Sequence, residues 1–345
     1  MMENKSRRAG AQMSALHKIM KWPQTGITII LLILFTLLAL DENAFFTSGN
    51  MLNVARQTAI NIVIGIPITF TLAAGLLDLS IGSLACLGGI LTSALITGHS
   101  NASMEICPQL PFVPALLLGV AITALFGFLN GLIITKLKLP PFIVTLAMQE
   151  IAKGAVLTFS RGFPISNLPE VCTKFGRGST LGIPNAAVVM LALLVIFWII
   201  LSKTKFGRHV YAVGGNAECA RLSGVNVNRV KCIIYTLNGA MAWVAGILVA
   251  FRLGSAQPDI GATYGLDAIT ACCLGGTAMG GGKGYMFGTV LGCLFLTCLS
   301  IGFNLMDVNT YWQQTIKGIV LVLAISMNNR DAISFKRKAL KAKAA

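Results

Sequence analysis

The stretch KTKFGRHVYAVGGNAECARLSGVNVNRVK, which runs from Lys203 to Lys231, decides the fold. It contains six Lys and Arg residues and a single acidic residue, and it lies between apolar runs at 185–202 and 232–251. Short loops that are rich in Lys and Arg stay on the cytoplasmic side of a membrane. The stretch therefore predicts a cytoplasmic loop between two membrane spans.

The same loop contains the start and stop signals of a short helix. Asn216 can cap the N-terminus, Glu218 falls in the first turn, and Gly224 can end the helix about two turns later. We therefore expect a helix over residues 216–223. A polar helix between membrane spans must contact something in water, such as a protein partner.

The composition extends the membrane assignment to the whole chain. Of 345 residues, 55% are hydrophobic and 11% are charged, and the mean hydropathy is +0.77. A soluble domain carries about 25% charged residues. The net charge of +15 comes from Lys and Arg in short loops and at both ends of the chain, without the basic, aromatic-interleaved face of a nucleic-acid-binding protein. The lipid bilayer, rather than nucleic acid, is the expected surrounding.

The apolar runs predict an all-α polytopic membrane protein with about ten transmembrane helices, several of them short or broken by Gly. Cytoplasmic segments would then hold 20 of the 27 Lys and Arg residues, which places both termini inside. The expected domains are a cytoplasmic segment 1–23, a permease domain 24–327 and a basic cytoplasmic tail 328–345. The predicted spans are 24–40, 59–76, 80–97, 112–134, 141–159, 185–202, 232–251, 265–280, 285–303 and 312–327.

Three blocks of sequence, in order along the chain, resemble one family. Residues 75–83 read GLLDLSIGS and are similar to the G-G-I-D-L-S-V-G-S signature of ribose-type (monosaccharide) ABC importer permeases. Residues 211–231 look like the coupling loop of that family, and residues 255–284, continued by 312–318, look like its C-terminal signature. The spacing of Glu218, Ala220 and Gly224 also resembles the E-A-A-x-x-x-G loop by which ABC permeases dock on an ATPase. Departures occur at Leu76, Cys219 and Gly265.

The resemblance implies a transport subunit in the bacterial inner membrane rather than an enzyme. Its expected partners are a cytoplasmic ABC ATPase, an extracytoplasmic sugar-binding protein and a second permease copy, most simply in a homodimer. The chain is expected to bind no cofactor, because the Gly-rich stretch before Lys283 is no Walker motif, and ATP and magnesium belong to the partner. The residues implied for the ATPase contact are Asn216, Glu218, Ala220, Arg221 and Gly224.

Other cargoes and another energy source stay open. The same architecture could carry a branched-chain amino acid, a nucleoside or a furanose-like signal molecule. An ion-coupled secondary transporter is a second alternative, and it would need intramembrane acids as relays. The two candidates for such acids are Asp78 and Asp267. Capping of a helix is the favoured role for Asp78, and it stays open for Asp267.

Polar side chains within the spans are the candidates for cargo contacts. Amides and aromatic rings bind sugars, but buried membrane amides also hold helices together, and we expect most of the candidates to do so. The candidates are Asn61, Asn130, Gln149, Asn238, Trp243 and Asn304.

Three further expectations concern charges and thiols. Glu150 and Lys153 lie one turn apart within a span and are expected to neutralise each other. Cys107 and Cys172 fall in predicted outer loops, where an oxidising compartment permits a disulfide. The remaining Cys and His residues show no metal-site spacing, so no metal is expected.

Overall fold

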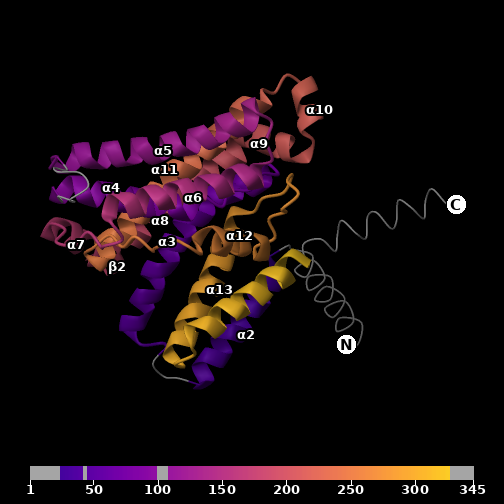
Figure 1. Cartoon of the computed structure of the whole chain (residues 1–345). Helices are drawn as coiled ribbons and strands as arrows, with labels where there is room; N and C mark the ends of the chain where they lie inside the picture. The colour runs from indigo at the N-terminus through magenta and orange to yellow at the C-terminus, as the bar shows by residue number, and fades with distance from the viewer. Residues whose placement is uncertain (1–23, 42–44, 99–107, 327–345) are drawn as a thin grey trace, which may run out of the picture.

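The computed structural model describes residues 24–41, 45–98 and 108–326, which form a helical bundle (Figure 1). A further helical segment covers residues 310–326. The named elements are α2 (Thr25–Asp41), α3 (Ser48–Ala73), α4 (Ile81–Thr97), α5 (Phe112–Lys136), α6 (Pro141–Ser160), α7 (Glu170–Arg177), β1 (Ser179–Thr180), β2 (Ile183–Pro184), α8 (Asn185–Lys203), α9 (Lys205–Gly215), α10 (Ala217–Leu222), α11 (Val227–Leu253), α12 (Tyr264–Leu274) and α13 (Met286–Leu305).

The prediction of an all-α polytopic membrane protein is confirmed in its main part. Six helices are long and apolar enough to cross a membrane, namely α3, α5, α6, α8, α11 and α13, and α2, α4 and α12 are shorter apolar helices. Strand structure in the described residues is limited to the antiparallel pair β1–β2, in which Thr180 faces Ile183. The count of ten spans and the placement of the termini stay predictions, and segments 1–23 and 328–345 lie outside the described residues.

Two predicted spans differ most from the helices of the structure. α3 begins at Ser48 rather than near residue 59, because Thr47 caps its N-terminus with a hydrogen bond from the Asn50 backbone. Its first turns are polar, so a search for apolar runs does not detect them. α12 stops at Leu274 rather than near residue 280, because the following glycines form a turn in which Gly276 has a φ of 89°.

Close helix packing depends on glycine in the centre of the bundle. α11 packs against α5, α4 and α3, with its middle turns buried. A Cβ added at Gly246 would lie 1.9 Å from the Ala85 carbonyl oxygen, and one added at Gly239 would lie 2.1 Å from the Thr123 oxygen. Small residues let membrane helices approach at backbone distance, so these glycines set the spacing of α11 against α4 and α5.

The substitution Gly246→Ala should lower the free energy of unfolding by about 3 kcal/mol, because the added methyl group overpacks the α4–α11 contact. Reversible unfolding in mixed micelles measures this change. Gly26→Ala on α2 is the matched control, since no atom lies within 4 Å of a Cβ at that position. Equal stability of the two variants would contradict the proposed role of Gly246.

Two breaks in the helices lie beside each other. One is the segment 74–80 between α3 and α4, and the other is the segment 275–285 between α12 and α13. The Gly282 backbone N–H donates to the Ala73 carbonyl at 2.9 Å, and a Cβ on Gly75 would lie 3.5 Å from the Gly280 oxygen. Residues about 200 positions apart in the sequence therefore form one region of irregular backbone next to α9 and α12.

Candidate functional site

The structure confirms the short helix that the loop sequence predicts. Asn216 Oδ1 accepts hydrogen bonds from the backbone N–H groups of Glu218 at 3.0 Å and Cys219 at 2.9 Å, so Asn216 caps α10. Gly224, with a φ of 84°, ends the helix and donates to the Arg221 carbonyl at 3.0 Å. α10 lies at one end of the molecule, beyond α9 (Figure 1).

The outer face of α10 is exposed and charged. Arg221 Nε donates to a Glu218 carboxylate oxygen at 3.1 Å, and about two thirds of each side chain is accessible to solvent. The hydrogen bond and charge of Arg221 lower the pKa of Glu218 below its usual value. The carboxylate therefore stays charged at neutral pH. Ala220 is buried toward the protein, whereas Leu222 is 76% exposed, so α10 presents a mixed apolar and charged surface.

α9 connects α10 to the two helix breaks. The Tyr211 hydroxyl donates to the Gly284 carbonyl at 2.8 Å, and burial raises the pKa of this tyrosine. A Cβ on Gly214 would lie 1.9 Å from the Ala73 oxygen, and one on Gly281 would lie 2.5 Å from the Gly214 oxygen. α9 therefore links α10 to the backbone at the end of α3 and in the break just before α13.

Asp78 lies in a fully buried hydrogen-bond network at the first break. Its Oδ1 accepts from the Ser80 backbone N–H at 2.9 Å and from the Ser80 hydroxyl at 2.6 Å. Its Oδ2 accepts from Asn238 Nδ2 on α11 at 2.6 Å. Asn130 Nδ2 on α5 donates to the Ser80 hydroxyl oxygen at 2.9 Å, and Thr71 on α3 contacts Asn238. The network joins four helices, and Asp78, Asn130 and Asn238 meet in it rather than at an open cavity.

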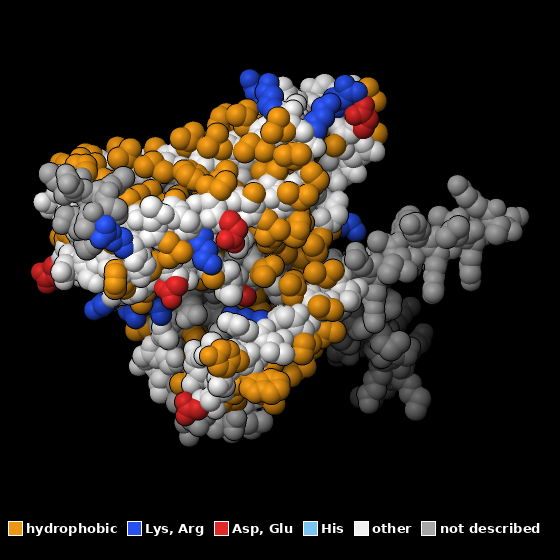
Figure 2. Space-filling model, in the orientation of Figure 1, with side chains coloured by type: hydrophobic (Ala, Val, Ile, Leu, Met, Phe, Trp, Pro, Cys, Tyr) orange, Lys and Arg blue, Asp and Glu red, His pale blue; other side chains and the backbone are white. Residues whose placement is uncertain are grey.

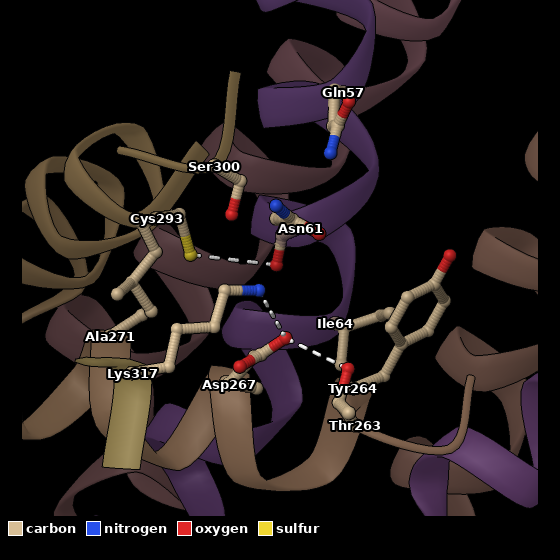
Figure 3. Close-up of a pocket in the computed structure, with 12 residues that line it drawn as sticks. Gln57, Asn61, Ile64, Thr263, Tyr264, Asp267, Ala271, Cys293, Ser300 and Lys317 are labelled. Carbon is tan, nitrogen blue, oxygen red and sulfur yellow. Dashed lines mark hydrogen bonds and ion pairs between the residues drawn. The ribbon is translucent and has the colours of Figure 1, made fainter. Parts of the chain in front are cut away.

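A second polar cluster surrounds a pocket of about 120 Å³ between α3, α12, α13 and the helix 310–326 (Figure 3). Asp267 Oδ2 lies 3.4 Å from Lys317 Nζ and accepts from the Thr263 hydroxyl at 3.0 Å. Asn61 Nδ2 donates to the Thr297 hydroxyl at 2.9 Å. The pocket also contains the following residues: Gln57, Ile64, Tyr264, Ala268, Ala271, Cys293, Leu296 and Ser300.

The pocket therefore combines two residues that sequence reasoning singled out with several that it missed. Asn61 and Asp267 come from different regions of the sequence and border the same space. Lys317 lies within the predicted span 312–327, and a Lys at membrane depth is itself a signal of a functional site. Thr263 and Ser300 gave no sequence signal, because isolated hydroxyl groups are common in membrane helices.

The other cargo candidates lie outside this pocket. Trp243 Nε1 donates to the Thr92 hydroxyl at 2.9 Å and packs between α4 and α5. Asn304 accepts from Gln313 Nε2 at 2.8 Å near the end of α13. Gln149 is partly exposed on α6. These contacts of Trp243 and Asn304 join neighbouring elements.

One expectation about charges is wrong, and one about thiols stays a prediction. Glu150 and Lys153 form no ion pair among the described residues, and both side chains are exposed on α6. Cys172 is buried on α7, whereas Cys107 lies outside the described residues, so their disulfide stays a prediction.

The structure also gives a physical reason for one departure from the family pattern. A Cβ on Gly265 would lie 3.1 Å from the Leu79 carbonyl oxygen, so α12 approaches the first helix break closely at this point. The family pattern has Glu where this chain has Gly265, and a side chain here would need the Leu79 backbone to shift by a few tenths of an ångström.

Comparison with known proteins assigns the chain to a family. A sequence profile described as "Branched-chain amino acid transport system / permease component" matches residues 50–325. The chain is similar to the ribose import permease protein RbsC of Bacillus subtilis (strain 168), with 40% identity over 88% of this chain and 91% of the relative. It is also similar to RbsC of Escherichia coli (strain K12), with 37% identity over 88% and 92%.

A third relative carries a different name. The galactose/methyl galactoside import permease protein MglC of Salmonella typhimurium is 32% identical over 94% of this chain and 100% of the relative. No solved structure matches the chain. The chain is therefore a multi-pass membrane protein that belongs to the family of ABC importer permeases that includes the ribose import permeases.

Proposed function

We propose that this chain is the membrane-spanning permease subunit of an ATP-driven importer for a monosaccharide in a bacterial inner membrane. An extracytoplasmic binding protein delivers the sugar, and two permease copies, both with ten spans and cytoplasmic termini, form the pathway. Support comes from the relatives, which are named ribose and galactose/methyl galactoside import permeases.

The observation that carries the proposal is the placement of α10. This capped, exposed helix rests through α9 on both helix breaks. An ATPase that moves α10 would therefore move the backbone at the end of α3 and in the break just before α13. The chain supplies the moving contact, while ATP and magnesium are bound by the partner.

The pocket around Asn61 and Asp267 is the proposed passage for the cargo. It offers amide, hydroxyl, carboxylate and ammonium groups as donors and acceptors, together with the Tyr264 ring. Hydroxyl-rich sugars are recognised by such groups. A cargo delivered by a binding protein needs little affinity for the pathway, so a small polar pocket suits release as well as entry.

One observation favours a second cargo class. The Asp267 carboxylate and the Lys317 ammonium face the same pocket, an arrangement that can also bind the two charged ends of an amino acid. The description of the matching family profile names branched-chain amino acid transport. Because the relatives are named as ribose and galactose/methyl galactoside import permeases, we propose a monosaccharide ahead of an amino acid as the cargo.

Uptake into proteoliposomes tests the function. The chain, co-reconstituted with its ATPase and binding protein, should import labelled ribose when ATP is present and should continue after a protonophore is added. Import of labelled leucine instead would shift the cargo to amino acids. Uptake that stops with the protonophore and needs no ATPase would identify a secondary carrier.

A variant of the pocket refines the same test. Asp267→Asn should lower uptake about tenfold, because it leaves Lys317 partly buried without its ion-pair partner. Glu170→Gln is the matched control, since it removes an exposed ion pair with Lys174 on α7 and should leave uptake unchanged. Equal uptake by both variants would remove Asp267 from the passage.

A further inference from the structure

The middle of α6 carries two charges that form no ion pair with any described residue. Glu150 and Lys153 lie near the centre of the 20-residue helix Pro141–Ser160, one of the six long apolar helices. Both side chains are exposed, and neither has an ion-pair partner within 4 Å among the described residues. Facing lipid, each charge would cost about 2.5 to 3.5 kcal/mol at the bilayer centre.

A charged residue that shares a pocket with Lys153 does not offset this desolvation cost. Lys153 and Asp259 border the same small pocket, but Asp259 is itself exposed and forms no ion pair with Lys153. α6 packs with its opposite side on α4 and α5. Figure 2 shows acidic and basic side chains in the middle of the face that is seen there, between hydrophobic patches.

The exposed face of α6 has the pattern of a helix–helix seam. Ile143, Glu150 and Leu157 recur every seven residues, and Leu146 and Gly154 fall between them. This spacing places all five on one side of the helix. Gly154 has no atom within 4 Å of its Cβ position, and an exposed Gly at the centre of a membrane helix permits close approach of another helix. The seam is apolar at both ends and charged in the middle.

We propose that this α6 seam (Ile143, Leu146, Glu150, Gly154 and Leu157, with Lys153 at its edge) contacts the α6 seam of a second copy of this chain. The inference rests on the proposed two-permease importer and names its contact. A two-fold contact brings the same surface from each copy together, and one that carries both an acid and a base is self-complementary. Glu150 pairs with the partner subunit's Lys153, and the same pair forms again by symmetry.

The geometry of two parallel membrane helices allows this exchange. A two-fold axis along the membrane normal keeps both copies of α6 at the same depth. Residues three apart differ in height by about 4.5 Å along a helix, which the long Glu and Lys side chains can bridge across the Gly154 contact. Both charges are then removed from lipid at once.

Charge reversal tests the contact in the full chain. Single-molecule bleaching of labelled protein in lipid vesicles counts the copies per complex at several dilutions. Glu150→Lys and Lys153→Glu should each raise the dissociation constant of the dimer at least about tenfold, because four like charges meet. The double variant Glu150→Lys/Lys153→Glu should return it to the wild-type value. Glu170→Lys on α7, another exposed charge reversal, should change nothing.

Each other result overturns the proposal. Dimers that survive both single reversals place the contact elsewhere, and a double variant as dissociated as the single variants shows that the two charges do not pair across copies. A wild-type chain that is monomeric in vesicles also refutes the seam. The experiment measures dimer dissociation and not sugar uptake. The result for the α6 seam therefore holds even if the importer carries a different cargo.

Discussion

Replacing Gly224 by proline should abolish ATP-driven uptake, whereas replacing it by asparagine should preserve most of it. Gly224 has a φ of 84° and donates its backbone N–H to the Arg221 carbonyl. Proline fixes φ near −65° and has no N–H, and at such a site it costs about 3 kcal/mol or more. Asparagine tolerates the left-handed conformation, so it keeps the end of α10 in place.

The expected loss of uptake follows from the path between α10 and the helix breaks. If 3 kcal/mol is lost from the step that couples the ATPase to the pathway, uptake falls about a hundredfold. The measurement is ATP-dependent uptake in proteoliposomes, together with capture of the ATPase by the tagged permease. Equal uptake by the proline and asparagine variants would show that the shape of α10 does not matter for coupling.

The α10 loop shows which features the sequence could predict. Its start and stop depend on Asn216 and Gly224 acting on nearby backbone groups, so the signal is local. The membrane class likewise follows from apolar runs, each of which is visible in a short window of sequence. These features were predictable because their causes lie within one or two helical turns.

The pocket and the buried network show why the rest could not be predicted. Asn61, Asp267 and Lys317 come from three helices, and no local pattern states which spans pack together. Asp78 and Asn238 are 160 positions apart, so their hydrogen bond depends on the close packing that Gly239 and Gly246 permit. The pairing of Glu150 with Lys153 was wrong because spacing alone brings side chains to one face without fixing their orientation.

Asp78→Ala should destabilise the permease by about 3 kcal/mol or more. The substitution removes both carboxylate oxygens, so the Ser80 hydroxyl and N–H and the Asn238 amide lose their acceptor in a fully buried site. A buried donor left without a partner costs about 1 to 3 kcal/mol. Unfolding in mixed micelles measures the change in free energy, and the fraction of folded protein in the membrane gives an independent readout.

Asp78→Asn separates a structural role of this acid from a role in ion coupling. The asparagine oxygen can still accept from Ser80, and the Asn238 amide can turn over because both of its polar atoms already contact the Thr71 hydroxyl, at 3.2 and 3.0 Å. We therefore expect this variant to keep most of the stability and of the ATP-driven uptake. A proton or cation relay through Asp78 predicts the opposite, since an amide cannot exchange a proton at this site. Loss of uptake by a stable Asp78→Asn protein would thus favour the ion-coupled carrier, and its retention leaves Asp78 as the buried acceptor that holds four helices at the break next to α9.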